Sequence, residues 1–195
     1  MARRFTPQEK PRKNGNVNLM PKYVALLRGI NVGGHRVSMG NLRALFSELG
    51  FAGVETFIAS GNVIFETEKS NPDVLETRIE AHLKSSLGYE VATFLRTPAE
   101  LLAVVESCPF APTESDSLYV TFLKAPLAET HRANLDALPK DTDEFSHAGR
   151  ELFRLVRGKV TESAISDAQY NRALKGAIGT TRNINTVQKL AEKYI

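Results

Sequence analysis

The sequence has little of what marks secreted or membrane-spanning proteins. Cys108 is the only cysteine, so no disulfide can form within the chain, and we predict a cytoplasmic protein. No apolar run approaches the roughly 20 residues that a membrane-spanning helix needs, so we expect no membrane contact. The N-terminal segment also lacks the apolar centre of a secretory signal.

Patterns typical of catalytic and metal sites are also missing. His131 and His147 have no acidic or cysteine partner at metal-ligand spacing. No serine-nucleophile motif or evident carboxylate pair stands out, and Cys108 lies on an apolar stretch typical of an inert buried thiol. We therefore expect no metal and no cofactor, and the sequence names no reaction.

What remains is the composition of a globular protein whose charge is unevenly distributed. The chain has 195 residues, of which 42% are hydrophobic and 24% charged, which are ordinary values for a globular fold. The net charge of +3 divides into +5 for residues 1–22, −7 for 23–148 and +5 for 149–195. The acidic body therefore ends in a basic third, which could form one face for a nucleic acid.

Residues 1–19 are polar and basic, with too little apolar surface to offset the entropy lost on ordering. We predict that they form a disordered tail. A basic arm for a nucleic acid or a membrane surface is the functional alternative. The stretch "MPKYVALL" from Met20 resembles a natural start, which favours an extension without function.

The first half of the chain, residues 20–96, has the pattern βαββαβ. Apolar strands are predicted at 23–27 and 90–96, and a hairpin at 54–67. Two amphipathic helices lie between them, one after Ser38 and one that begins at Asn71-Pro72.

The second half, residues 118–195, repeats much of this order. Residues 97–117 form a helix with a capping box, followed by a polar linker. A strand, a helix, a two-stranded segment and a helix that ends at Gly179 then give βαββα, followed by a last helix. The repeated order predicts an α+β protein with two ferredoxin-like α/β sandwich subdomains in tandem and a C-terminal helix.

A glycine-rich stretch, "RGINVGGH" at residues 28–35, separates the first strand from the first helix and is called the glycine loop below. Such a loop can bring backbone N–H groups close to an anion, and an arginine and an asparagine in it add polar contacts. The spacing matches neither common phosphate-loop motif, so a long turn is the alternative. The candidate ligand-binding residues here are Arg28, Asn31, Gly33 and Gly34.

A second polar stretch, "GTTRNINT" at residues 179–186, precedes the last helix and is called the TTRN loop below. One polar group suffices to cap a helix, whereas Thr180, Thr181, Arg182, Asn183 and Asn185 all crowd its start. We therefore predict ligand contacts from Thr181, Arg182 and Asn183.

A third candidate is the turn of the first hairpin, where Ser60 and Asn62 flank Gly61. Ordinary turn chemistry explains these residue types as well. His35 in the glycine loop is a candidate proton-transfer group, with a solvated loop side chain as the alternative.

The quoted loops carry a family resemblance. The stretches "YVALLRGINVGGHRVSM", "LRALFSELGF", "TFIASGNVIFE" and "TTRNINTVQKLAE" resemble the domain of unknown function 1697 family, found mainly in bacteria. The resemblance implies a pair of ferredoxin-like domains, and it implies no established activity or catalytic residues. Ile184 and the region "VRGKVTESAIS" depart from the expected pattern, so a pocket there could differ from that of relatives.

Three functions fit these observations. The first is the binding of a phosphate-bearing ligand, a nucleotide or a nucleic acid, in a cleft between the glycine loop and the TTRN loop. The second is an enzyme acting on a small phosphorylated or carboxylated substrate, with His35 or Ser60 handling the proton. The third is a regulatory or scaffold module that binds protein. The first requires Arg28 and Arg182 to be neighbours in space, whereas the sequence leaves the oligomeric state open.

Overall fold

The computed structural model describes residues 20–58, 61–68 and 71–195. The predicted tail, residues 1–19, and the candidate Ser60 lie outside the described residues. None of the helices in the described ranges combines the length and apolarity that crossing a bilayer would require.

The first half folds as an antiparallel sheet with the strand order β2-β3-β1-β4. The Ser38 hydroxyl caps the first helix by accepting from Asn41 N at 3.1 Å, and Asn71 caps the second. The elements in chain order are β1 (Lys22–Arg28), α1 (Met39–Glu48), β2 (Ala52–Thr56), β3 (Asn62–Glu66), α2 (Pro72–Leu87) and β4 (Ala92–Arg96).

The second half repeats this topology, with the strand order β6-β7-β5-β8. Thr97 and Glu100 form the predicted capping box at the start of the connecting helix. The elements are α3 (Pro98–Glu106), β5 (Ser117–Leu123), α4 (Glu129–Asp136), β6 (Asp143–Ala148), β7 (Glu151–Val156), a 3₁₀ turn η1 (Val160–Glu162), α5 (Asp167–Ala173), β8 (Gly179–Asn183) and α6 (Ile184–Tyr194).

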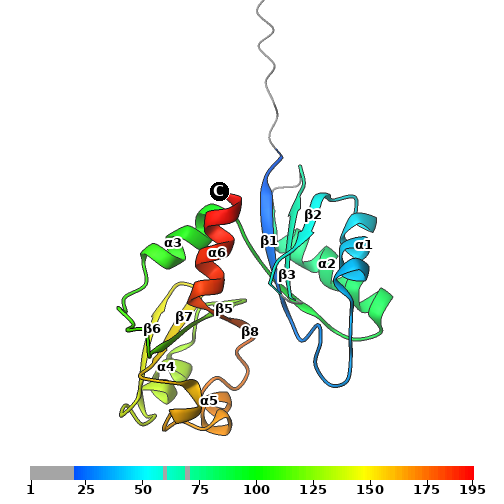
Figure 1. Ribbon diagram of the computed structural model, residues 1–195. Helices are drawn as coiled ribbons and strands as arrows, with labels where there is room; N and C mark the ends of the chain where they lie inside the picture. The colour runs from blue at the N-terminus through cyan, green and yellow to red at the C-terminus, as the bar shows by residue number, and fades with distance from the viewer. Residues whose placement is uncertain (1–19, 59–60, 69–70) are drawn as a thin grey trace, which may run out of the picture.

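Both halves are ferredoxin-like, as predicted, and their sheets share one core. Helices α1 and α2 cover the outer face of the first sheet, and α4 and α5 cover the outer face of the second (Figure 1). The two inner faces contribute Ile64, Phe94, Phe122 and Phe153 to a single buried cluster with α3 and α6. Burial of this apolar surface holds the two halves together.

The prediction for the segment before α6 was wrong in one respect. The helix expected to run to Gly179 ends at Ala173, and residues 179–183 form a fourth strand, β8, paired with β5. Gly176, at φ +93°, takes the chain out of the helical conformation. The sequence of β8 does not indicate a strand, because its residues are mostly polar and do not alternate with apolar ones. Its pairing partner, β5, also lies about 60 residues earlier in the chain.

Acid should weaken one contact of the second half. Backbone N–H groups of Thr113 and Gly158 donate to the Asp116 carboxylate at 2.9 and 3.1 Å and, together with Arg157, lower its pKa from 3.8 to about 2. Because the pKa is lower in the folded state, this stabilisation is present above pH 3.8 and is lost as the pH falls towards 2.

We therefore expect Asp116→Asn to be less stable than the wild type at pH 7, and the difference to shrink between pH 3.8 and 2. Urea denaturation at several pH values measures both stabilities. Parallel stability curves across that range would show that the carboxylate charge is not the cause.

Candidate functional site

The side chain of Arg182 joins β1, the hairpin turn and β8. Its Nε donates to Asn62 Oδ1 at 2.7 Å, and its Nη2 donates to the carbonyl oxygens of Leu27 and Gly61, each at 2.9 Å. Its Nη1 donates to Thr180 Oγ1 at 2.8 Å and to the carbonyl oxygen of Thr181 at 2.9 Å. These five bonds match the five N–H donors of a guanidinium, so Arg182 ties the two halves together.

The charge of Arg182 has no acidic partner among the described residues, because all five acceptors are neutral. Burial lowers the pKa of its guanidinium to about 10, so the group stays charged at neutral pH. A mostly buried, uncompensated positive charge favours an anion nearby.

Two other candidate residues form hydrogen bonds that stabilise the local backbone. Asn62 is buried, and its Nδ2 donates to the carbonyl oxygens of Phe57 and Ile58 at 3.1 and 3.4 Å. Asn183 is the N-cap of α6, where its Oδ1 accepts from Asn185 N at 2.9 Å. Local structure accounts for the contacts that these two side chains make.

Hydrogen bonds and one ring contact fix the conformation of the glycine loop. Asn31 Oδ1 accepts from Val37 N at 2.8 Å, and the Tyr89 hydroxyl donates to the carbonyl oxygen of Ile30 at 2.8 Å. The ring of His35 stacks on Tyr89, with 3.9 Å between the centroids. The glycines allow the positive φ of this loop, which is +67° at Gly33 and +88° at Gly34.

Two adjoining hollows open beside this loop. The first hollow, of about 500 Å3, lies between the glycine loop and β8. The second hollow, of about 430 Å3, lies beside the end of α5 and shares with the first Arg28, Asn171, Gly179 and Thr181. The first also includes Asn31 and Arg182, and the second includes Thr121, Tyr170 and Lys175. The expected proximity of Arg28 and Arg182 is therefore confirmed.

Arg28 is exposed at the end of β1, and its side chain makes no hydrogen bond or ion pair with any described residue. No Asp or Glu of the described chain lines either hollow. Thr181 lies between the two hollows, and its Oγ1 is 2.8 Å from Thr121 Oγ1. The hollows thus combine positive charge with hydroxyl and amide groups.

Five predicted residues line neither hollow, namely Gly33, Gly34, His35, Asn62 and Asn183. Gly34 and His35 line a different hollow beside the glycine loop, which Asn31 also borders. In the described ranges, no group of three or more His, Cys, Asp or Glu side chains could hold a metal ion.

Asn171, Tyr170 and Thr121 line the hollows although no sequence pattern marks them, and Lys175 stands out in the sequence only as part of the basic third. Asn171 and Tyr170 belong to a short helix with an ordinary capping signal, so nothing in their local sequence marks a site. The pairing of β8 with β5 brings Thr121 opposite Thr181.

The expected basic face of the C-terminal third is partly neutralised. Arg154 Nε donates to the buried carboxylate of Asp143 at 2.7 Å. Arg157 forms ion pairs with Glu144 at 2.7 Å and with Asp116 at 3.1 Å. These pairs and the internal bonds of Arg182 leave fewer free charges for a nucleic acid than the count suggests.

Comparisons with known proteins give a family match and a structural match. Residues 20–153 match the family described as "Protein of unknown function (DUF1697)", a range that contains the glycine loop and ends before the TTRN loop. A solved structure of a conserved bacterial protein from Streptococcus pneumoniae is similar with a TM-score of 0.71 at 22% identity, covering 90% of this chain and 99% of that chain. At that identity the similarity shows the fold alone. No curated protein matches the sequence.

Proposed function

Because the chain belongs to the DUF1697 family of proteins of unknown function, we propose its function from geometry: it binds a small phosphate-bearing ligand in the two hollows beside the glycine loop. The observation that carries the proposal is that Arg28 and Arg182 both line the first hollow, whose described lining residues include no carboxylate. Like charges facing one cavity repel each other, and a bound anion relieves that repulsion.

The two arginines have different roles in this proposal. Arg182 is fixed by its five bonds to neutral acceptors, so it contributes a permanent positive field rather than new hydrogen bonds. Arg28 has free donors and forms the direct ion pair, with the bidentate geometry that a guanidinium offers to a phosphate. Thr181 and Asn171 supply neutral hydrogen bonds at the junction of the hollows.

Several features favour a small ligand over a nucleic acid. Ion pairs occupy Arg154 and Arg157, which weakens the basic face that a polynucleotide backbone would need. A hollow of about 500 Å3 is within the range of small-molecule sites. A nucleotide or a sugar phosphate fits this description.

An enzyme acting on such a ligand would need a group to move a proton. His35 lines a different hollow, and Ser60 lies outside the described residues. The geometry therefore supports ligand binding more strongly than catalysis.

Thermal denaturation at low salt tests the proposal with phosphate, pyrophosphate, nucleotides and sugar phosphates as probes. A ligand at a hundred times its Kd stabilises the folded state by about 2.7 kcal/mol, which should raise the melting temperature by roughly 5–10 °C in a protein of this size. We expect Arg28→Gln to lose most of that increase and high salt to reduce it.

Arg172→Gln is the matched control, because Arg172 is exposed and lines neither hollow. It should respond to the probes as the wild type does. Equal increases in the wild type and in Arg28→Gln would place the anion elsewhere. No increase with any probe would favour a protein-binding scaffold.

A further inference from the structure

The positive residues are divided between the two hollows. Arg182 lines only the first hollow, Lys175 lines only the second, and Arg28 lines both. A ligand confined to one hollow meets Arg28 and one other cation, whereas a longer ligand that crosses the junction meets all three. We infer that the ligand carries two linked anionic groups, as a diphosphate does, with Arg28 between them and Lys175 binding the second; this inference rests on the proposed function.

The ammonium group of Lys175 is available while its backbone is fixed. Its side chain is exposed and forms no ion pair or hydrogen bond with a described residue. Its backbone N–H donates to the carbonyl oxygen of Arg172 at 3.2 Å, and its own carbonyl oxygen lies 3.2 Å from His131 Nε2. These contacts anchor the chain at the rim of the second hollow and leave the charged end free.

Polar groups of neutral residues continue from one hollow into the other. Asn171 and Thr181 line both hollows, and the Tyr170 side chain lines the second. Burial raises the pKa of the Tyr170 hydroxyl, so that group keeps its proton. The lining therefore suits oxygen-rich groups along its length.

The second hollow is less suited to a nucleobase. Tyr170 is its only aromatic lining residue among those that the structure describes. The Tyr170 ring stacks with Phe145 at 6.0 Å between centroids, and the Arg154 guanidinium lies 4.7 Å from its centroid. These neighbours compete with a base for the ring, whereas Lys175 remains free for an anion.

The charge of the lining residues also favours a ligand with two linked anionic groups. A phosphate monoester carries about −1.5 to −2 at neutral pH, which leaves part of the charge of Arg28, Lys175 and Arg182 unbalanced. A second linked phosphoryl group supplies the missing negative charge and reaches the second hollow.

Isothermal titration calorimetry at low salt, without divalent cations, tests the inference with inorganic phosphate and pyrophosphate on the full chain. We expect the wild type to bind pyrophosphate at least about tenfold more tightly than phosphate, as one added charge-assisted contact allows. Lys175→Gln should weaken pyrophosphate binding by about tenfold and change phosphate binding less than about twofold. Arg172→Gln, which removes a nearby charge outside both hollows, should leave the ratio unchanged.

The outcomes separate the inference from the proposed function. Equal affinities for the two probes, or an equal loss of both in Lys175→Gln, would overturn the inference. A matching loss in Arg172→Gln would overturn it too, because the effect would then be general electrostatics. If neither probe binds the wild type, or if Arg28→Gln binds both as well as the wild type does, the proposed function itself fails.

Discussion

Replacing Arg182 with leucine is expected to lower the melting temperature by roughly 6–12 °C. The change removes three hydrogen bonds that cross between the halves, to Asn62 Oδ1 and to the carbonyl oxygens of Leu27 and Gly61. Hydrogen bonds to charged groups contribute about 1.5–3 kcal/mol each. The relief of a buried charge offsets part of this loss, which leaves about 3 kcal/mol and corresponds to that change in a protein of this size.

Two further variants define the role of Arg182. Arg182→Lys keeps the charge but has three donors in place of five, so it should recover only part of the lost stability. Arg172→Leu makes the same change at an exposed position and should stay within about 0.5 kcal/mol of the wild type. A wild-type melting temperature for Arg182→Leu would show that the guanidinium does not tie the halves together.

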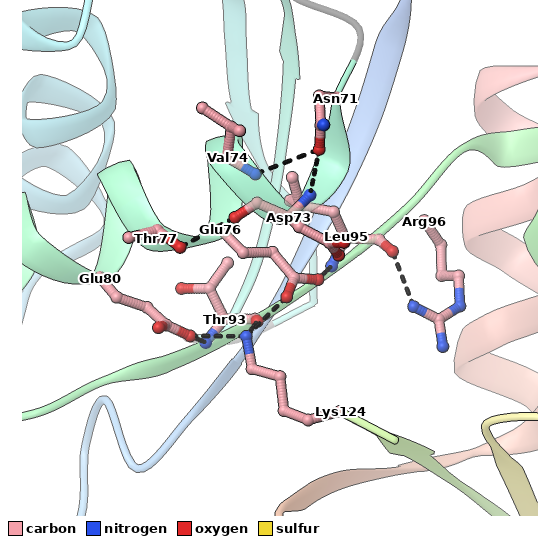
Figure 2. Close-up of polar contacts among 10 residues, drawn as sticks. All are labelled: Asn71, Asp73, Val74, Glu76, Thr77, Glu80, Thr93, Leu95, Arg96 and Lys124. Carbon is pink, nitrogen blue, oxygen red and sulfur yellow. Dashed lines mark hydrogen bonds and ion pairs between the residues drawn. The ribbon is translucent and has the colours of Figure 1, made fainter. Parts of the chain in front are cut away.

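Glu76→Gln is expected to cost about 2–3 kcal/mol of stability, because it removes a buried charge from the contact between α2 and the second half. Glu76 Oε1 accepts from Leu95 N at 2.8 Å, and Glu76 Oε2 lies 2.6 Å from Lys124 Nζ (Figure 2). The glutamine can still accept from Leu95 N, but its amide group then faces the Lys124 ammonium. Chemical denaturation would measure the loss.

The contact also protects the open edge of the first sheet. Strand β4 is an edge strand, so the N–H groups on its free side lack a neighbouring strand. Glu76 accepts from Leu95 N, and Glu80 accepts from Thr93 N at 2.8 Å. Lys124 holds both carboxylates in place, with its Nζ 2.7 Å from Glu80 Oε1.

Glu80→Gln is the matched control, one helical turn away. Glu80 contacts the same lysine, but its side chain is 33% exposed, against 7% for Glu76, so solvent screens its charge and the loss should be smaller. In a Lys124→Met background, Glu76→Gln should cost less than in the wild type. An equal loss for both glutamates, or additive effects of Glu76→Gln and Lys124→Met, would contradict a buried charge pair.

Local sequence patterns were enough to predict most helices and strands and the fold class. Helix starts at Ser38, Asn71 and Thr97 depend on hydrogen bonds within a few residues, so local sequence predicts them well. The apolar strands have patterns that follow directly from which face they bury. Since short connections between such elements allow few topologies, the order βαββαβ was enough to predict a ferredoxin-like half.

Which side chains share a site depends on long-range packing that no local pattern reveals. Arg182 and Asn183 stand next to each other in a polar stretch, yet one spans two halves and the other caps a helix. Sequence shows a charge but not the acceptors around it, and those of Arg182 in the first half come from residues more than 100 positions away. Lys175 and Arg28 line one hollow only because two sheets pack through a common core. Local hydrogen bonding sets the elements, whereas the burial of both inner faces sets which loops meet.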